Sequence, residues 1–230
     1  MKLLEDFFGQ IGRYSPCSEA TSAKVVSFCK GGGTALYIGC EITTLLKIRE
    51  AGFDVKALAS DSPYAERVKA AGIESVKSSF FELPDDIDSY DLVWYDGTVE
   101  LSSTQKRLEY LRSHCKKGCI LVLRTLSWLI EPSPDTKKYC KARFGEVLPF
   151  DQVLRLAKDE GFKIVDFYIS PKTDWTVNYY TPLLKLSEEY LASQDVQESV
   201  AIGISKLRKE AEVFELHCEE YSYVYYILKG

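Results

Sequence analysis

The sequence predicts an α/β fold in which a mainly parallel β-sheet is covered by helices on both faces. Short apolar runs alternate with helical periodicity along most of the chain, as in repeated β–α units. Residues 35–61 give the clearest unit: a strand, a turn, a helix and a second strand that ends on an acid. A chain of 230 residues with 46% hydrophobic content is also long enough to bury a full core. We therefore expect one domain, residues 1–230, of the doubly wound class.

Apolar runs predict seven strands, near residues 35–39, 54–60, 75–79, 90–95, 119–127, 162–169 and 218–228. The helix after the second strand has the best-defined ends, because Ser62 suits an N-cap, Pro63 suits the first helical position and Gly72 follows the last turn. The last run, "YSYVYYILK", alternates like a half-buried strand, which would make its tyrosines ordinary sheet residues.

Two segments lie outside this regular alternation. Residues 1–30 are expected to form a helical entry segment before the first strand. Residues 171–215, between the last two strands, are too many for a simple crossover, so we interpret them as a helical lid or cap.

Composition favours a small-molecule partner. The net charge is −5, the isoelectric point is near 5.3, and no run of basic residues would bind nucleic acid or an anionic membrane. The N-terminus does not resemble a secretion signal and no apolar run has membrane-spanning length, which predicts a cytoplasmic protein. Seven scattered cysteines without a Cys-x-x-Cys pair indicate reduced thiols, with Cys40 a small buried residue, rather than a disulfide framework or a metal site.

The turn after the first strand, residues 37–43, is the expected ligand site, because ligands of doubly wound sheets bind beyond the carboxyl ends of the strands. Asp61 lies 22 residues after Gly39, where an acid can accept hydrogen bonds from both ribose hydroxyls; the alternative is an exposed aspartate that begins a helix. A dinucleotide fingerprint is absent, and Glu41 would repel a pyrophosphate, which disfavours an NAD enzyme. A cofactor with an ammonium and a sulfonium would tolerate Glu41.

A series of short segments supports that kind of cofactor. In chain order they are "SPCSEAT", "YIGC", "ALASDSPYAERVKAAGI", "FFELP", "YDLVWYDG", "CKKGCILVL", "LSWL", "DEGFKIVDFYI" and "DWTVNYYTPL". Together their order and spacing resemble the class I S-adenosylmethionine-dependent methyltransferases, small-molecule branch (methyltransferase type 11-like), over nearly the whole chain. The resemblance implies a Rossmann-like methyltransferase fold with strand order 3-2-1-4-5-7-6 and an antiparallel last strand. It also implies S-adenosylmethionine as the cofactor and a small-molecule acceptor.

The resemblance assigns candidate residues to both halves of the site. Those that would bind the cofactor are Gly39, Glu41, Asp61, Ser62, Ser79, Phe80 and Tyr95. The candidates for catalysis are Asp96, Tyr179 and Tyr180, and Tyr139 is a further one, although pocket wall or core is the favoured interpretation of each tyrosine. Methyl transfer itself mainly requires that the nucleophile be held in line with the methyl group.

Aromatic residues and the two histidines also have alternative interpretations. Trp128 and Trp175, with the two tyrosines at 179 and 180, could line an aromatic acceptor pocket or simply pack the insertion on the sheet. His114 and His217 are interpreted as structural.

The first glycine motif departs from the family's Asp/Glu-x-Gly-x-Gly-x-Gly. Tyr37 stands at the acidic position, while Glu41 and Thr43 replace glycines, so strain of roughly 1–3 kcal/mol would result if a left-handed backbone were needed there. We expect the donor to bind less tightly than at a glycine-rich turn, with Glu41 pairing with its ammonium. Arg124 and Thr125 stand where relatives carry Ser-Glu.

These departures leave three functional hypotheses. The first is methyl transfer from S-adenosylmethionine to a small acceptor. The second is a non-catalytic protein of the same fold that acts as a ligand-binding or regulatory subunit, because the turn glycines and one acid of the pocket are missing together. The third is a different enzyme class that uses the same fold.

Overall fold

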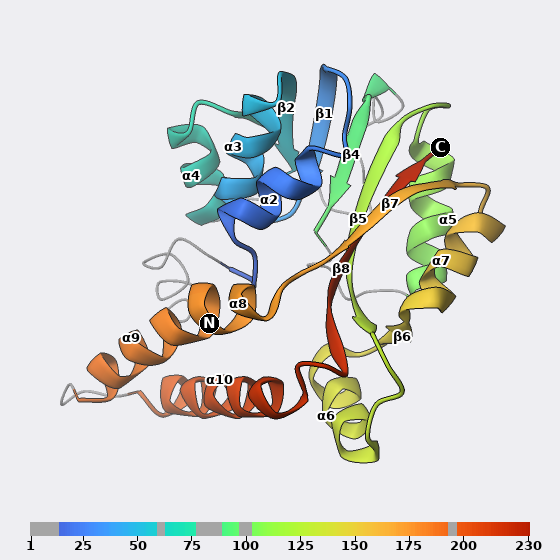
Figure 1. Ribbon diagram of the computed structural model, residues 1–230. Helices are drawn as coiled ribbons and strands as arrows, with labels where there is room; N and C mark the ends of the chain where they lie inside the picture. Colours follow the sequence, from blue (N-terminus) through green and yellow to red (C-terminus); the bar gives the residue numbers. More distant parts are fainter. Residues whose placement is uncertain (1–13, 59–62, 77–88, 97–102, 193–196) are drawn as a thin grey trace.

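The computed structural model describes residues 14–58, 63–76, 89–96, 103–192 and 197–230. Its centre is a twisted sheet that runs through the whole molecule (Figure 1). Strand β1 (Gly33–Ile38) lies between β2 (Phe53–Leu58) and β4 (Leu92–Tyr95), and both neighbours run parallel to it.

The other strands extend the sheet on both sides. The outer strand next to β2 is β3 (Glu74–Val76), and beyond β4 lie β5 (Ile120–Trp128), β8 (Tyr221–Lys229) and β7 (Lys163–Ile169). Strand β8 is antiparallel to both β5 and β7. The order β3-β2-β1-β4-β5-β8-β7 therefore confirms the predicted arrangement. The sequence did not predict β6 (Leu148–Pro149), which pairs with β5, because two residues carry no periodicity.

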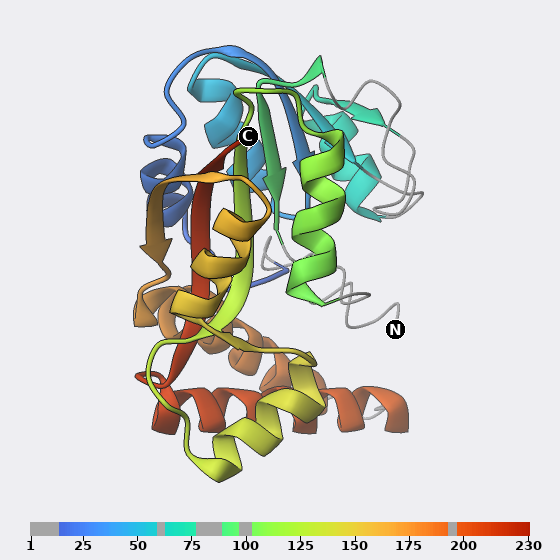
Figure 2. The ribbon, with the colours of Figure 1, turned by 90° about the vertical axis from the view of Figure 1, so that its right-hand side faces the viewer.

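Helices cover both faces of the sheet, as predicted (Figures 1 and 2). On one face lie α2 (Glu19–Val26), α3 (Ile42–Glu50) and α4 (Pro63–Ala70), and on the other lie α5 (Thr104–His114) and α7 (Phe150–Asp159). Helix α4 begins at Pro63 and Gly72 follows it with φ of +68°, while the predicted N-cap Ser62 lies outside the described residues.

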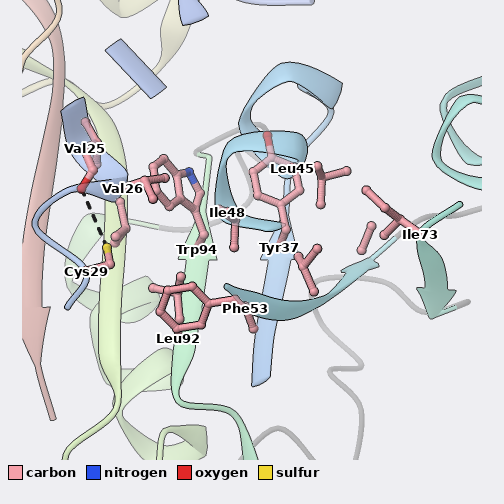
Figure 3. Close-up of a cluster of buried hydrophobic side chains, with 14 of the residues drawn as sticks. Val25, Val26, Cys29, Tyr37, Leu45, Ile48, Phe53, Ile73, Leu92 and Trp94 are labelled. Atoms are coloured by element: carbon pink, nitrogen blue, oxygen red, sulfur yellow. Dashed lines mark hydrogen bonds between the residues drawn. The ribbon is translucent and has the colours of Figure 1, made fainter. Parts of the chain in front are cut away.

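Two hydrophobic clusters, one under each layer of helices, form the core. Alternation along β4 shows the division: Leu92 and Trp94 belong to the cluster under α2 and α3, whereas Val93 and Tyr95 belong to the cluster under α5 and α7. Figure 3 shows the first cluster, with Tyr37 of β1 packed near Leu45 and Ile48 of α3. Successive side chains of β4 therefore point to opposite faces of the sheet, up to the end of the strand where the candidate site begins.

A third cluster lies beyond one end of the sheet (Figure 1). It joins α6 (Pro134–Phe144) to the predicted insertion, which contains α8 (Lys172–Trp175), the π-helix η2 (Thr176–Tyr180), α9 (Thr181–Leu191) and α10 (Glu198–His217). The insertion is helical throughout its described part. Its function as a lid stays a prediction.

Two sequence interpretations need correction. Strand β8 is not half-buried: Tyr221, Tyr225 and Tyr226 are fully buried, because β8 lies between β5 and β7 and helices or the third cluster cover both of its faces. Cys40 is partly exposed rather than buried, although it packs against the core cluster under α3. All seven cysteines are unpaired thiols.

His114 and His217 bond only to neighbouring helix and turn groups among the partners described. The His114 ring contacts the carbonyl oxygen of Tyr110 at 2.7 Å, and the His217 ring contacts Glu220 at 2.8 Å. Within the described ranges, no helix combines the length and apolar character needed to cross a bilayer.

Candidate functional site

The turn between β1 and α3 brings Gly39 against the end of β4. A Cβ atom at Gly39 would lie 2.6 Å from both the Asp96 Cβ and the Tyr37 hydroxyl oxygen, so only glycine fits. The requirement at Gly39 is one of space, because Gly39 is not among the glycines with positive φ. Glu41 has an ordinary extended backbone with φ of −95°, and no described residue other than glycine has positive φ. The strain considered for residues 41 and 43 is therefore absent from the described turn.

Asp96, directly after β4, is the centre of a buried polar cluster. Its side chain is 1% exposed and accepts hydrogen bonds from the Tyr37 hydroxyl at 2.5 Å and from the Trp94 indole N–H at 3.3 Å. An Arg124 guanidinium nitrogen lies 3.9 Å from the same carboxylate. Tyr37 also accepts a hydrogen bond from the backbone N–H of Glu41 at 3.0 Å, which fixes the ring between the two strands and the turn.

Glu41 is the N-cap residue of α3, but its side chain makes no capping hydrogen bond to the helix. One oxygen of the Glu41 carboxylate accepts hydrogen bonds from the backbone N–H of Tyr14 at 2.7 Å and from the Ser15 hydroxyl at 3.0 Å. Burial, and secondly the nearby Asp96 carboxylate, raise the pKa of Glu41 from 4.5 to about 7. Glu41 thus gains or loses a proton near neutral pH, unlike an exposed glutamate.

Arg124 of β5 is the cation of this cluster. It is 1% exposed, donates to the Ser15 hydroxyl at 3.0 Å and to the Pro16 carbonyl at 2.8 Å, and lies over the Tyr223 ring with 3.7 Å between the guanidinium carbon and the ring centroid. In the sequence, Arg124 stands out only as a departure from relatives, and no role is predicted for it. A useful signal was present, since Arg124 is the only charged residue in the apolar run "CILVLRTLSW".

The structure brings three of the predicted site residues together: Gly39, Glu41 and Asp96. Tyr95 instead points to the opposite face of the sheet, where it is fully buried under α5 and α7. Four predicted cofactor residues, Asp61, Ser62, Ser79 and Phe80, lie outside the described residues.

The predicted catalytic tyrosines lie in the third cluster. The Tyr180 hydroxyl donates to Glu210 at 3.1 Å. Burial, followed by the charge of Glu210, raises the pKa of Tyr179 well above 10, and Tyr223 and Glu41 contribute in the same direction.

The two tryptophans pack as core residues. Trp175 stacks between Phe214 and Tyr223, with ring centroids 4.3 and 5.0 Å apart, and Trp128 meets Tyr221 edge-on at 5.9 Å. Trp175 thus packs the insertion on the sheet, whereas Trp128 also lines a hollow of about 690 Å³ beside α6 and α7. The Arg124 guanidinium lies over the Tyr223 ring, so the aromatic stack connects the insertion to the polar cluster.

The cluster combines acidic and cationic side chains. Glu41 and Asp96 lie with the Arg124 guanidinium at the carboxyl ends of β1 and β4, and the Arg67 guanidinium lies over the ring of Tyr14, whose backbone N–H bonds to Glu41.

Comparison with known proteins shows the fold. No family model and no curated protein matches the sequence. The solved structures do: a SAM-dependent methyltransferase from Geobacter sulfurreducens, in complex with S-adenosyl-L-homocysteine, aligns over 99% of this chain and 97% of its own, with a TM-score of 0.79 and 13% identity. This chain has the fold of the S-adenosylmethionine-dependent methyltransferases.

Two further structures indicate how broad this likeness is. A SAM-dependent methyltransferase from Thiobacillus denitrificans, also in complex with S-adenosyl-L-homocysteine, aligns over 100% of this chain and 98% of its own, with a TM-score of 0.78 and 13% identity. The [4+2]-cyclase SpnF aligns over 95% of this chain and 83% of its own, with a TM-score of 0.65 and 14% identity. The same fold thus carries more than one activity, and function must be argued from the site.

Proposed function

We propose that this chain binds S-adenosylmethionine at the carboxyl ends of β1 and β4 and transfers its methyl group to a small-molecule acceptor. The observation that carries the proposal is the pair of buried carboxylates, Glu41 and Asp96, at the place where a doubly wound sheet binds its ligand. The whole-length likeness to methyltransferases in complex with S-adenosyl-L-homocysteine supports it.

The donor supplies an already activated methyl group, so the protein's task is positioning. Asp96 is held by Tyr37, Trp94 and Arg124, and its rigid carboxylate would fix the cationic half of the donor. Glu41 would add a second carboxylate when ionised. Asp61 is proposed to accept hydrogen bonds from the ribose, and the tyrosines at 179 and 180 to form the wall between donor and acceptor.

Calorimetric titration with S-adenosylmethionine and S-adenosylhomocysteine tests this proposal. Wild type should bind in the micromolar range, and Asp96→Asn should bind about 10- to 100-fold more weakly, because a hydrogen bond to a charged group contributes roughly 1.5–3 kcal/mol. Asp61→Ala should lose a similar factor. Asp91→Asn is the matched control, since Asp91 bonds to Thr34 and Lys116 just before β4 and away from the turn.

The packing of the turn favours a second candidate, a non-catalytic protein of the same fold. Glu41 and Arg124 both bond to residues 14–16, so the turn and the N-terminal segment are joined by buried polar contacts. In that case wild type should bind neither ligand at millimolar concentration. A Glu41→Gly/Thr43→Gly double variant should then gain binding, because it restores the glycines at both positions.

A further inference from the structure

A pocket of about 520 Å³ opens between α6, η2 and α10. Its apolar wall is formed by Tyr139, Tyr179 and Leu207, and three cationic side chains, Arg143, Lys206 and Lys209, surround it. None of the lining residues that the structure describes is acidic, although the whole chain has a net charge of −5. The volume lies within the range of small-molecule sites, and the lining combines an apolar surface with a few charged groups.

The wall of this pocket is built rigidly. Glu210 is 4% exposed, and its carboxylate accepts hydrogen bonds from the Arg143 guanidinium at 2.6 Å and from the Tyr180 hydroxyl at 3.1 Å. Arg143 is therefore fixed at the rim while its side chain stays 48% exposed. Lys206 is exposed and forms no ion pair with any described residue, so it can meet an anion without first leaving a partner.

The π-helix η2 links the pocket to the polar cluster. It buries two consecutive tyrosines, Tyr179 and Tyr180, and π-helical turns are frequent at functional sites. Tyr179 lines the pocket, and its ring meets that of Tyr180 with 5.3 Å between centroids. Tyr180 lies 6.1 Å from Trp175, which stacks on Tyr223, the ring that the Arg124 guanidinium lies over. Aromatic contacts thus run from the pocket to the polar cluster.

We propose that the pocket between α6, η2 and α10 binds the methyl acceptor, and that this acceptor is an aromatic or similarly planar molecule with a carboxylate or phosphate group. The planar part packs on Tyr139 and Tyr179, and the anionic group is held by Arg143 and Lys206. That the bound molecule is a methyl acceptor rests on the proposed function, but binding of the anion can be tested without any donor.

Ligand-observed NMR titration with benzoate, phenyl phosphate and benzamide tests the site in the donor-free protein. Both anions should bind, and benzamide, which has the same ring without the charge, should bind at least tenfold more weakly. Lys206→Gln should weaken the anions by about two- to fivefold, as expected for one solvent-exposed charge pair, and leave benzamide unchanged. A preference for benzoate or for phenyl phosphate decides which anionic group the acceptor carries.

Arg208→Gln is the matched control. Arg208 is an exposed cation on the same helix, but it borders a different hollow between α9 and α10. Equal binding of benzamide and benzoate, or equal losses in Lys206→Gln and Arg208→Gln, would overturn the anion site. If S-adenosylhomocysteine fails to bind while the anions still bind, the proposed methyl transfer fails and the anion site stands; the reverse result removes only the anion site.

Discussion

The raised pKa of Glu41 makes the stability of this protein depend on pH near neutrality. The carboxyl group titrates at about 7 in the folded chain, against 4.5 for the ordinary value, because burial and the Asp96 carboxylate disfavour its charge. Between these two pH values the folded state binds more protons than the unfolded state. Stability therefore falls as the pH rises through this window and is constant, with respect to this group, above it.

Replacing Glu41 by glutamine removes this dependence with little change of shape. One Glu41 oxygen accepts both hydrogen bonds, from Tyr14 and Ser15, and the amide oxygen of glutamine can accept the same two. A shift of this size corresponds to about 2–3 kcal/mol between pH 5 and pH 8, at 1.36 kcal/mol per unit. This is an upper value, because the positive end of α3 favours the ionised form.

Urea unfolding of wild type and Glu41→Gln at pH 5, 6, 7 and 8 measures the effect. The variant should gain about 2–3 kcal/mol on the wild type as the pH rises from 5 to 8, with most of the gain before pH 7. Glu50→Gln is the control, because Glu50 is 61% exposed and a surface pair such as its contact with Lys47 contributes under about 1 kcal/mol. Parallel stability curves for wild type and Glu41→Gln would refute a raised pKa at Glu41.

Two further substitutions test the packing on either side of the site. Gly39→Ala should destabilise the fold by roughly 1–3 kcal/mol in urea, because its Cβ would collide with Tyr37 and Asp96; an unchanged midpoint would mean that the turn is looser than described. Trp175→Ala should lose about 3–5 kcal/mol, because the indole is stacked between two aromatic rings, whereas Val177→Ala, 61% exposed in the adjoining π-helix, should change stability by less than about 0.5 kcal/mol. Similar losses in the two variants would contradict the buried stack.

The candidate site was only partly visible in the sequence. Gly39, Glu41 and Asp96 could be placed, because each follows the end of an apolar strand or lies in the turn after it, and those positions meet at one edge of a parallel sheet. Tyr95, a predicted cofactor residue, lies on the other face of β4, in the cluster under α5 and α7. Its neighbour Trp94 faces Asp96 instead, and a strand whose residues are all buried gives no alternation from which to choose the face.

The layered α/β fold and the helical insertion could be predicted from the sequence alone, and the strand order from its likeness to a family. These features follow from periodicity and from the order of segments along the chain. The sequence could not predict that Arg124 reaches residues 15 and 16 and lies over Tyr223, because those groups are about a hundred positions away along the chain. The burial of Glu41 also could not be predicted from the sequence. Burial and the nearby Asp96 carboxylate together raise the pKa of Glu41, and both depend on distances in space rather than along the chain.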